Sequence, residues 1–284
     1  INLKNKFLLD RKKIKDSFFK NNLGKKNCND NTKLIDNLIK QIFKIIKLKN
    51  YGIEDAFCIC AVGGYGRRTL APFSDIDVLF IYDKDINEKK IEEMVQFMLF
   101  PFWDLGFKIG YAVRNLEDVQ LFAQKDHIIQ TSMLDARFIC GSTKLFKKTI
   151  LDFNNNISNK GINLLKQKIA ERKKRIEKGI LDYFKNEPNL KESEGSLRDI
   201  NFIFWCIKIL RLSRFKWMNE MSEYLTNKEK KIINSAFSFL LSLRCHLHYQ
   251  SERDNDRFSF DDQNEISKKI FKDNNENKSF SNSM

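Results

Sequence analysis

Two aspartates and the glycine-rich turn ahead of them carry the chemistry that this sequence could perform. The run from Gly63 to Asp77 reads GGYGRRTLAPFSDID. Glycines let a backbone approach a phosphate and present its N–H groups, because no Cβ stands in the way. Asp75 and Asp77 are two positions apart, so in an extended strand both carboxylates point to one face. Two such oxygen ligands suit Mg²⁺, which also takes water and substrate phosphates. The pattern indicates nucleotidyl transfer.

The residues around the turn support a phosphate site. The glycines alone lack the Lys-Ser/Thr ending of a Walker A loop and the spacing of a dinucleotide fingerprint, and a tight strand-to-helix turn would explain them equally well. The two arginines that follow offer guanidinium groups suited to phosphate oxygens. Asp77 opens an apolar run, where a charge needs a partner or a metal, the alternative being an Asx turn with Asp77 in solvent. We predict nucleotide binding by Gly63, Gly64, Gly66, Arg67, Arg68 and Ser74, and metal binding by Asp75 and Asp77.

Composition and length limit the classes of protein to which the chain can belong. The 284 residues suffice for about two domains, and the hydrophobic content of 42% is typical of globular proteins. No apolar run reaches the ~18–20 residues that span a bilayer, and the first residues make a poor signal peptide. None of the six cysteines forms a C-x-x-C pair. We therefore expect a cytoplasmic protein with reduced thiols and no membrane association. The sequence begins with Ile1 rather than with methionine, so we expect it to be a fragment.

The net charge of +14 raises the possibility of nucleic-acid binding. Lysine is used heavily along the whole chain, however, which indicates a compositional bias rather than one basic patch. The densest cluster, residues 171–175, falls in an apparent helix and is readily explained as a solvated face. A nucleic-acid-binding protein would also leave Asp75 and Asp77 unexplained, because carboxylates without a metal repel phosphate. Nucleic-acid binding is therefore kept only as an alternative.

Hydrophobic periodicity indicates an α+β fold. Residues 1–50 have helical spacing, and the apolar runs at 56–62 and 77–82 predict strands on either side of the glycine turn. Further expected elements are a helix over 91–100 stopped by Pro101, a strand over 108–114, a helix capped by Asn115, a strand near 135–140, and helices over 162–180, 200–212 and 228–247.

These elements predict a nucleotidyltransferase domain, with a small mixed β-sheet flanked by helices, followed by an all-α helical domain. The expected boundaries are 1–50 for an N-terminal helical segment, 51–155 for the nucleotidyltransferase domain, 156–270 for the helical domain and 271–284 for a polar, disordered tail.

The segment from 63 to 77 resembles the signature of the DNA polymerase β-type nucleotidyltransferase superfamily, a Gly-Gly/Ser turn followed by Asp-x-Asp. More narrowly, the chain is similar to the bacterial protein-PII uridylyltransferase/uridylyl-removing enzymes, with Thr69 where Glu is usual. Further motifs follow in order: FWDLGFKIGYAVRNLED (102–118), LDAR (134–137), EPNLKE (187–192), GSLRD (195–199), R-x-x-L-H (244–248) and Asp-Arg (256–257). Departures are Tyr111-Ala112 for His-Ser, and Ser193-Glu194 with Ser196 for a proline and two glycines. The likeness covers most of residues 50–263.

The resemblance implies a Mg²⁺-dependent enzyme that transfers UMP from UTP to a tyrosine of the PII signalling protein and releases pyrophosphate. Asp75 and Asp77 would bind the catalytic metal ions, and Asp135 would complete a two-metal site as the third carboxylate. The alternative for Asp135 is a pairing with Arg137 on the same strand face.

The resemblance also assigns a second loop. Lys191 and Arg198 would contact phosphate or base, with Asp199 orienting them. The alternative is a helix N-terminal loop in which Asp199 pairs with Arg198 or a neighbour. His248 and Asp256 are expected to hold the helical domain together.

Other functions stay open at this point. The transferase could use another acceptor, or the chain could be a non-catalytic basic nucleic-acid-binding protein or a poorly folding fragment. Nothing after residue 263 resembles the HD-type phosphohydrolase or ACT domains of the full-length family enzyme. We therefore expect transferase chemistry without hydrolysis or glutamine regulation.

Overall fold

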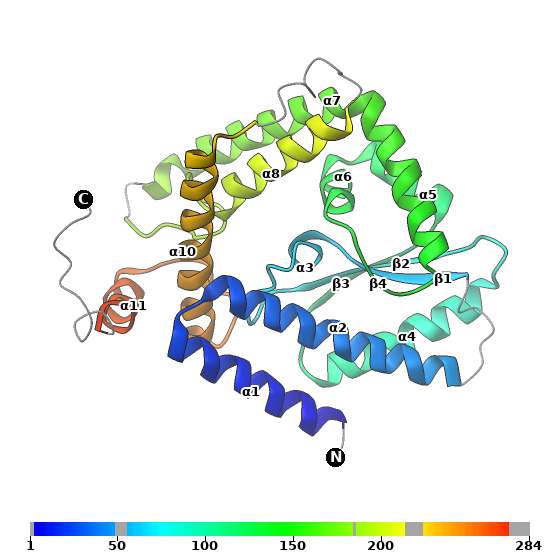
Figure 1. The fold of residues 1–284 in the computed structure, drawn as a ribbon, viewed down its shortest axis with the longest axis horizontal. Helices are drawn as coiled ribbons and strands as arrows, with labels where there is room; N and C mark the ends of the chain where they lie inside the picture. Colours follow the sequence, from blue (N-terminus) through cyan, green and yellow to red (C-terminus); the bar gives the residue numbers. More distant parts are fainter. Residues whose placement is uncertain (1–2, 49–55, 184–185, 214–223, 273–284) are drawn as a thin grey trace.

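A four-stranded sheet lies among helices in the computed structural model, which describes residues 3–48, 56–183, 186–213 and 224–272 (Figure 1). The strands are β1 (Phe57–Ala61), β2 (Ile76–Tyr82), β3 (Ile109–Asn115) and β4 (Arg137–Gly141), in the order β3-β2-β1-β4. The β2–β3 pair is parallel and the other two pairs are antiparallel. The predicted α+β fold with a small mixed sheet is confirmed. The predicted tail lies, from residue 273 on, outside the described residues.

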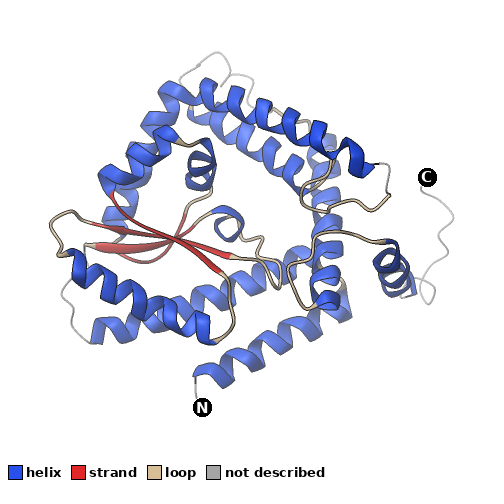
Figure 2. Ribbon diagram, turned by 180° about the vertical axis from the view of Figure 1, so that it is seen from behind, coloured by secondary structure: helices blue, strands red, loops and turns tan. Residues whose placement is uncertain are grey.

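The central strand β1 shows why the sheet is covered on both faces. All five of its residues are buried. Because side chains alternate along a strand, Phe57 and Ile59 join one core, with α2 (Gly24–Leu48) and α4 (Glu88–Asp104), while the two cysteines join the other. That second core contains side chains of the helices α5 (Leu116–Lys125), α6 (His127–Leu134) and α7 (Thr143–Tyr183). Figure 2 shows the sheet between these two helical layers.

The expectation that Pro101 stops its helix is wrong. Helix α4 runs from Glu88 to Asp104 with Pro101 inside it. The Asn87 side chain caps the start by accepting a hydrogen bond from the Lys89 N–H at 2.9 Å. Phe102, one residue beyond the proline, is buried in the core beside the sheet. This packing keeps the last turn helical, because tertiary contacts can override local propensity.

The region after the sheet is helical, as predicted. It contains α7, α8 (Leu197–Leu212), α10 (Asn227–Ser251) and α11 (Phe260–Lys272). Helix α7 has 41 residues and is longer than the predicted segment 162–180. It runs without a break across the expected boundary between residues 155 and 156. Within the described ranges, no helix has the length and apolar character needed to cross a membrane.

Helix α2 packs against α1 (Leu3–Asn21) and α10, and on the sheet side against β4 and α4. A Cβ on Gly24 of α2 would come within 2.2 Å of the Ser242 backbone nitrogen, so the two helices touch at backbone distance. The Sγ atoms of Cys28 and Cys245 lie 3.6 Å apart across the same contact, and both thiols are free. The contact therefore joins the beginning of the chain to the helical region.

His246 sits in this contact as a buried, neutral ring. Its centroid lies 4.6 Å from that of Phe18 in α1, and its Nε2 lies 2.9 Å from Asn22 Oδ1. The other ring nitrogen, Nδ1, is buried without a hydrogen-bond partner. Burial lowers the pKa of His246 to about 4, with Lys269 adding to the shift.

We therefore expect stability to fall as the pH drops from about 6.5 towards 4. The unfolded chain takes up a proton at His246 in this window while the folded chain does not, so protonation favours unfolding. The His246→Gln variant can still donate to Asn22 but does not titrate. Urea unfolding of both proteins at a series of pH values should show a shallower loss of unfolding free energy for the variant. Parallel curves for the two proteins would contradict the assignment.

Candidate active site

The glycine turn follows β1 and forms the short helix α3 (Gly63–Gly66). A buried ion pair supports this turn. Arg137 of β4 donates to both carboxylate oxygens of Asp36 at 2.8 and 3.0 Å, and also to the carbonyl of Gly66 at 3.3 Å. The Tyr65 hydroxyl donates to Asp36 at 2.6 Å. A Cβ on Gly66 would lie 2.1 Å from the carbonyl oxygen of residue 135, so only glycine fits there. Arg137 thus supports the turn.

Asp75 and Asp77 face the same cavity as the turn. The cavity has a volume of about 340 Å³, and Gly63 and Gly64 line it together with both aspartates. Asp75 is exposed immediately before β2, whereas Asp77 lies within β2 and is half-buried. Burial raises the pKa of the Asp77 carboxyl and the charge of Asp75 raises it further, while Lys191 lowers it. Two adjacent carboxylates with too little compensating charge are what a cation would stabilise.

Gly110 is a site residue that the sequence reading missed. It pairs with Asp77 across the β2–β3 register, and a Cβ there would come within 2.7 Å of Asp77 Oδ1. On the opposite side, a Cβ on Gly63 would lie 3.1 Å from Asp77 Oδ2. Both glycines therefore leave space around this carboxylate. A glycine inside a strand often marks such a close approach, and that signal was present in the sequence.

The aspartate pair fits Mg²⁺ as a partial ligand set. The described part of the chain contains no group of three His, Cys, Asp or Glu side chains that could hold a metal ion. Mg²⁺ is usually held by one or two carboxylates, with the remaining positions taken by water and substrate phosphates. Asp75 and Asp77 could supply the protein's share of such a site.

Asp135 occupies a different environment from the one predicted. It lies at the C-terminal end of α6 rather than in a strand, and its side chain is fully buried. It is ion-paired with Arg67, accepts from Trp205 Nε1 at 2.8 Å and pairs with Lys208 at 2.7 Å. Both oxygens are occupied by these donors, and Asp135 also lines the cavity with Asp75 and Asp77. Its role as the third metal ligand stays a prediction. Asp135 does not pair with Arg137, which binds Asp36 instead.

Of the other predicted nucleotide-binding residues near the turn, two line the cavity and one does not. Arg67 lines the cavity with its Nε buried and without a hydrogen-bond partner, and its guanidinium lies 5.5 Å from the Trp205 ring. The Ser74 hydroxyl also lines the cavity, buried and without a partner. Arg68 is exposed, has a φ of 63° and lies outside the cavity lining, so the geometry does not support its predicted nucleotide contact.

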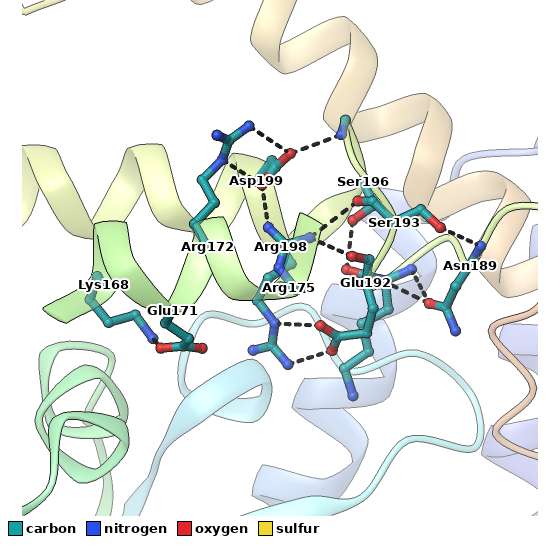
Figure 3. A network of polar contacts seen from close by, with 12 residues as sticks. Lys168, Glu171, Arg172, Arg175, Asn189, Glu192, Ser193, Ser196, Arg198 and Asp199 are labelled. Atoms are coloured by element: carbon teal, nitrogen blue, oxygen red, sulfur yellow. Dashed lines mark hydrogen bonds and ion pairs between the residues drawn. The ribbon is translucent and has the colours of Figure 1, made fainter. Parts of the chain in front are cut away.

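Hydrogen bonds and ion pairs attach the second predicted loop, residues 187–199, to α7 and α8 (Figure 3). The Asn189 side chain accepts from the backbone N–H groups of Lys191 and Glu192 at 2.9 and 2.8 Å. Arg175 of α7 donates to the carbonyl of Glu192 and pairs with Asp199. This arrangement holds the loop against the long helix, and it brings Lys191 to the cavity wall.

Asp199 pairs with α7 rather than with Arg198. It accepts from Arg172 Nε at 3.0 Å and from the Gly195 N–H at 2.8 Å (Figure 3). Arg198 lines the cavity and pairs instead with Glu192 at 2.6 Å. The cluster at 171–175, expected to be a solvated face, is therefore partly engaged in these ion pairs.

The helical region also holds the chain just ahead of the aspartates. His248 is fully buried, and its Nδ1 accepts from the Phe73 N–H at 3.3 Å. Its Nε2 lies 3.1 Å from Asp256, which also binds Arg244 at 2.6 Å. His248 and Asp256 thus pack α10 against the segment that leads to Asp75, and Asp256 also lines the cavity.

Replacing the buried carboxylate at residue 135 should destabilise the fold. The Asp135→Asn variant leaves Arg67 without its counter-charge, which we expect to cost about 3 kcal/mol or more. The matched control is Asp104→Asn, which removes an exposed ion pair with Lys4 and should change stability by less than about 0.5 kcal/mol. Chemical denaturation followed by circular dichroism measures both. Equal effects would show that Asp135 does not carry a buried charge in the folded protein.

Comparison with known proteins shows what this chain is similar to. Residues 163–284 match the family described as GlnD PII-uridylyltransferase. The chain is 34% identical to a bifunctional uridylyltransferase/uridylyl-removing enzyme of Phenylobacterium zucineum, over 80% of this chain and 24% of that protein. The similarly described proteins of Caulobacter vibrioides and Azospirillum brasilense are 35% and 37% identical, over 80% and 76% of this chain and 24% and 23% of those proteins. The chain thus spans about a quarter of the length of these relatives.

One solved structure also aligns with the chain. The crystal structure of a toxin–antitoxin with AMP-PNP covers 46% of this chain and 92% of that one, with 17% identity and a TM-score of 0.26. A likeness at that score supports no argument about function.

Proposed function

We propose that this relative of the bifunctional uridylyltransferase/uridylyl-removing enzymes transfers UMP from UTP to a tyrosine hydroxyl of the PII signalling protein, with Mg²⁺ as cofactor. The main support for the proposal is that one cavity is lined by both aspartates, Asp75 and Asp77, and by the glycines Gly63 and Gly64. Nucleotidyl transfer needs both a phosphate cradle and carboxylates for a divalent cation. The descriptions of the relatives support uridylyl as the group transferred and PII as the acceptor.

The reaction would exchange one bond to phosphorus for another. The tyrosine oxygen attacks the α-phosphorus of UTP and loses its proton to water. The bond from the α-phosphorus to the bridging oxygen breaks, and pyrophosphate leaves with the electron pair. Mg²⁺, when bound, would neutralise charge on the triphosphate and on the leaving group.

The residues of the chain position and balance charge in this scheme. Asp75 and Asp77 would hold the cation, with Gly110 leaving room beside Asp77. The backbone of the glycine turn would face the phosphates. Arg67, held by Asp135, and Lys191 line the same cavity and would place positive charge beside the phosphates. Most of the catalytic effect would then come from positioning and electrostatics.

Removing either carboxylate of the pair should abolish transfer while leaving the fold intact. We expect Asp75→Asn and Asp77→Asn each to lower the rate by at least about 100-fold. The matched control is Asp83→Asn, an exposed residue just beyond the other end of β2, which should keep full activity. The assay follows label from α-labelled UTP onto purified PII protein with Mg²⁺, and EDTA should stop the reaction.

Three results would decide between the alternatives. Circular dichroism should give the same spectrum for all the variants, so that lost activity reports on chemistry. Label that appears on another protein but not on PII would move the assignment to a nucleotidyltransferase with a different acceptor. Undiminished transfer by Asp77→Asn would contradict the proposed metal site.

A further inference from the structure

The cavity contains a buried amide that the scheme above does not use. Asn201 lies in the second turn of α8, and only 9% of its surface is exposed. It lines the cavity, and its side-chain oxygen is buried without a hydrogen-bond partner. Buried polar atoms in folded proteins nearly always have a partner, and an unpaired one is a cost to stability. A donor group on a bound ligand would satisfy this acceptor.

The side chains around Asn201 are apolar. Leu197 lies one turn earlier on the same face of α8, and Phe237 and Leu241 project from successive turns of α10. All three line the same cavity and belong to one hydrophobic cluster. A ligand group that suits this part of the cavity has apolar faces and a polar edge, and a nucleobase combines the two.

We propose that Asn201 binds the polar edge of the uracil base of the nucleotide. The Oδ1 atom accepts a hydrogen bond from the uracil N3–H, and the Nδ2 group donates to a neighbouring carbonyl oxygen of the base. Leu197, Phe237 and Leu241 cover the faces of the ring. The inference rests on the proposed function, because it assumes that the triphosphate of the same nucleotide lies at the glycine turn.

The acceptor tyrosine is the other flat group that the reaction brings to this cavity. Its single polar atom is the oxygen that attacks phosphorus, so this oxygen must lie at the aspartate pair. A tyrosine ring placed against Leu197 and Phe237 would leave the amide of Asn201 without a partner. The base of UTP satisfies the amide, and the tyrosine does not.

The first test separates the base from the phosphates. Affinities of the full chain for Mg²⁺·UTP and for Mg²⁺·tripolyphosphate, which has no base, are measured by calorimetry. We expect Asn201→Ala to weaken UTP binding by about 10- to 100-fold and to leave tripolyphosphate binding unchanged. The matched control is Asn234→Ala, an exposed residue of α10, which should change neither affinity. Equal losses for both ligands would overturn the proposal, since they would indicate a damaged cavity.

The second test removes the N3–H group of the base. The triphosphate of 3-methyluridine carries a methyl group at N3 and cannot donate a hydrogen bond to Asn201 Oδ1. We expect the wild-type chain to bind it at least about tenfold more weakly than UTP, and Asn201→Ala to reduce that ratio to less than about threefold, with Asn234→Ala as control. The same ratio in the wild type and in Asn201→Ala would overturn the proposal. A wild-type chain that shows this preference for UTP but does not label PII would contradict the acceptor assignment alone, and base binding by Asn201 would stand.

Discussion

The geometry of the site depends on the ion pairs and hydrogen bonds of the buried Asp135 carboxylate. A fully buried charge is tolerated only where opposite charges and hydrogen bonds surround it. Here they come from two distant segments: Arg67 follows the glycine turn, whereas Trp205 and Lys208 belong to α8. Lys168 of α7 also lies 4.8 Å from the Trp205 ring. One side chain therefore sets the position of the turn relative to the helices that close the cavity.

Two further contacts attach the helical region to the same cavity. Arg175 and Asp199 fasten the second loop between α7 and α8, which places Lys191 near Asp77. His248 holds the backbone of residue 73, two residues before Asp75. The cavity wall is therefore shared between the sheet and the helices after residue 143. Its shape depends on both parts being folded.

Local patterns in the sequence predicted the elements better than the partners of the side chains. The strands beside the glycine turn were readable because buried strands have continuous apolar runs, and the motifs pointed to Asp75 and Asp77. Helix α4 passes through Pro101 because Phe102 is buried, which no local rule reveals. The environment of Asp135 likewise depends on a tryptophan 70 residues away in the sequence. Such contacts require the three-dimensional arrangement.

The bend in α7 places its two halves against different parts of the site (Figure 1). Phe153, in the first half, packs in the core beside the sheet, and Arg175, in the second half, holds the second loop. Gly161 lies between them, and a Cβ there would come within 2.9 Å of Ile209 Cγ2 in α8. A larger residue at 161 would therefore push α8 away from α7, and with it the tryptophan that binds the buried carboxylate.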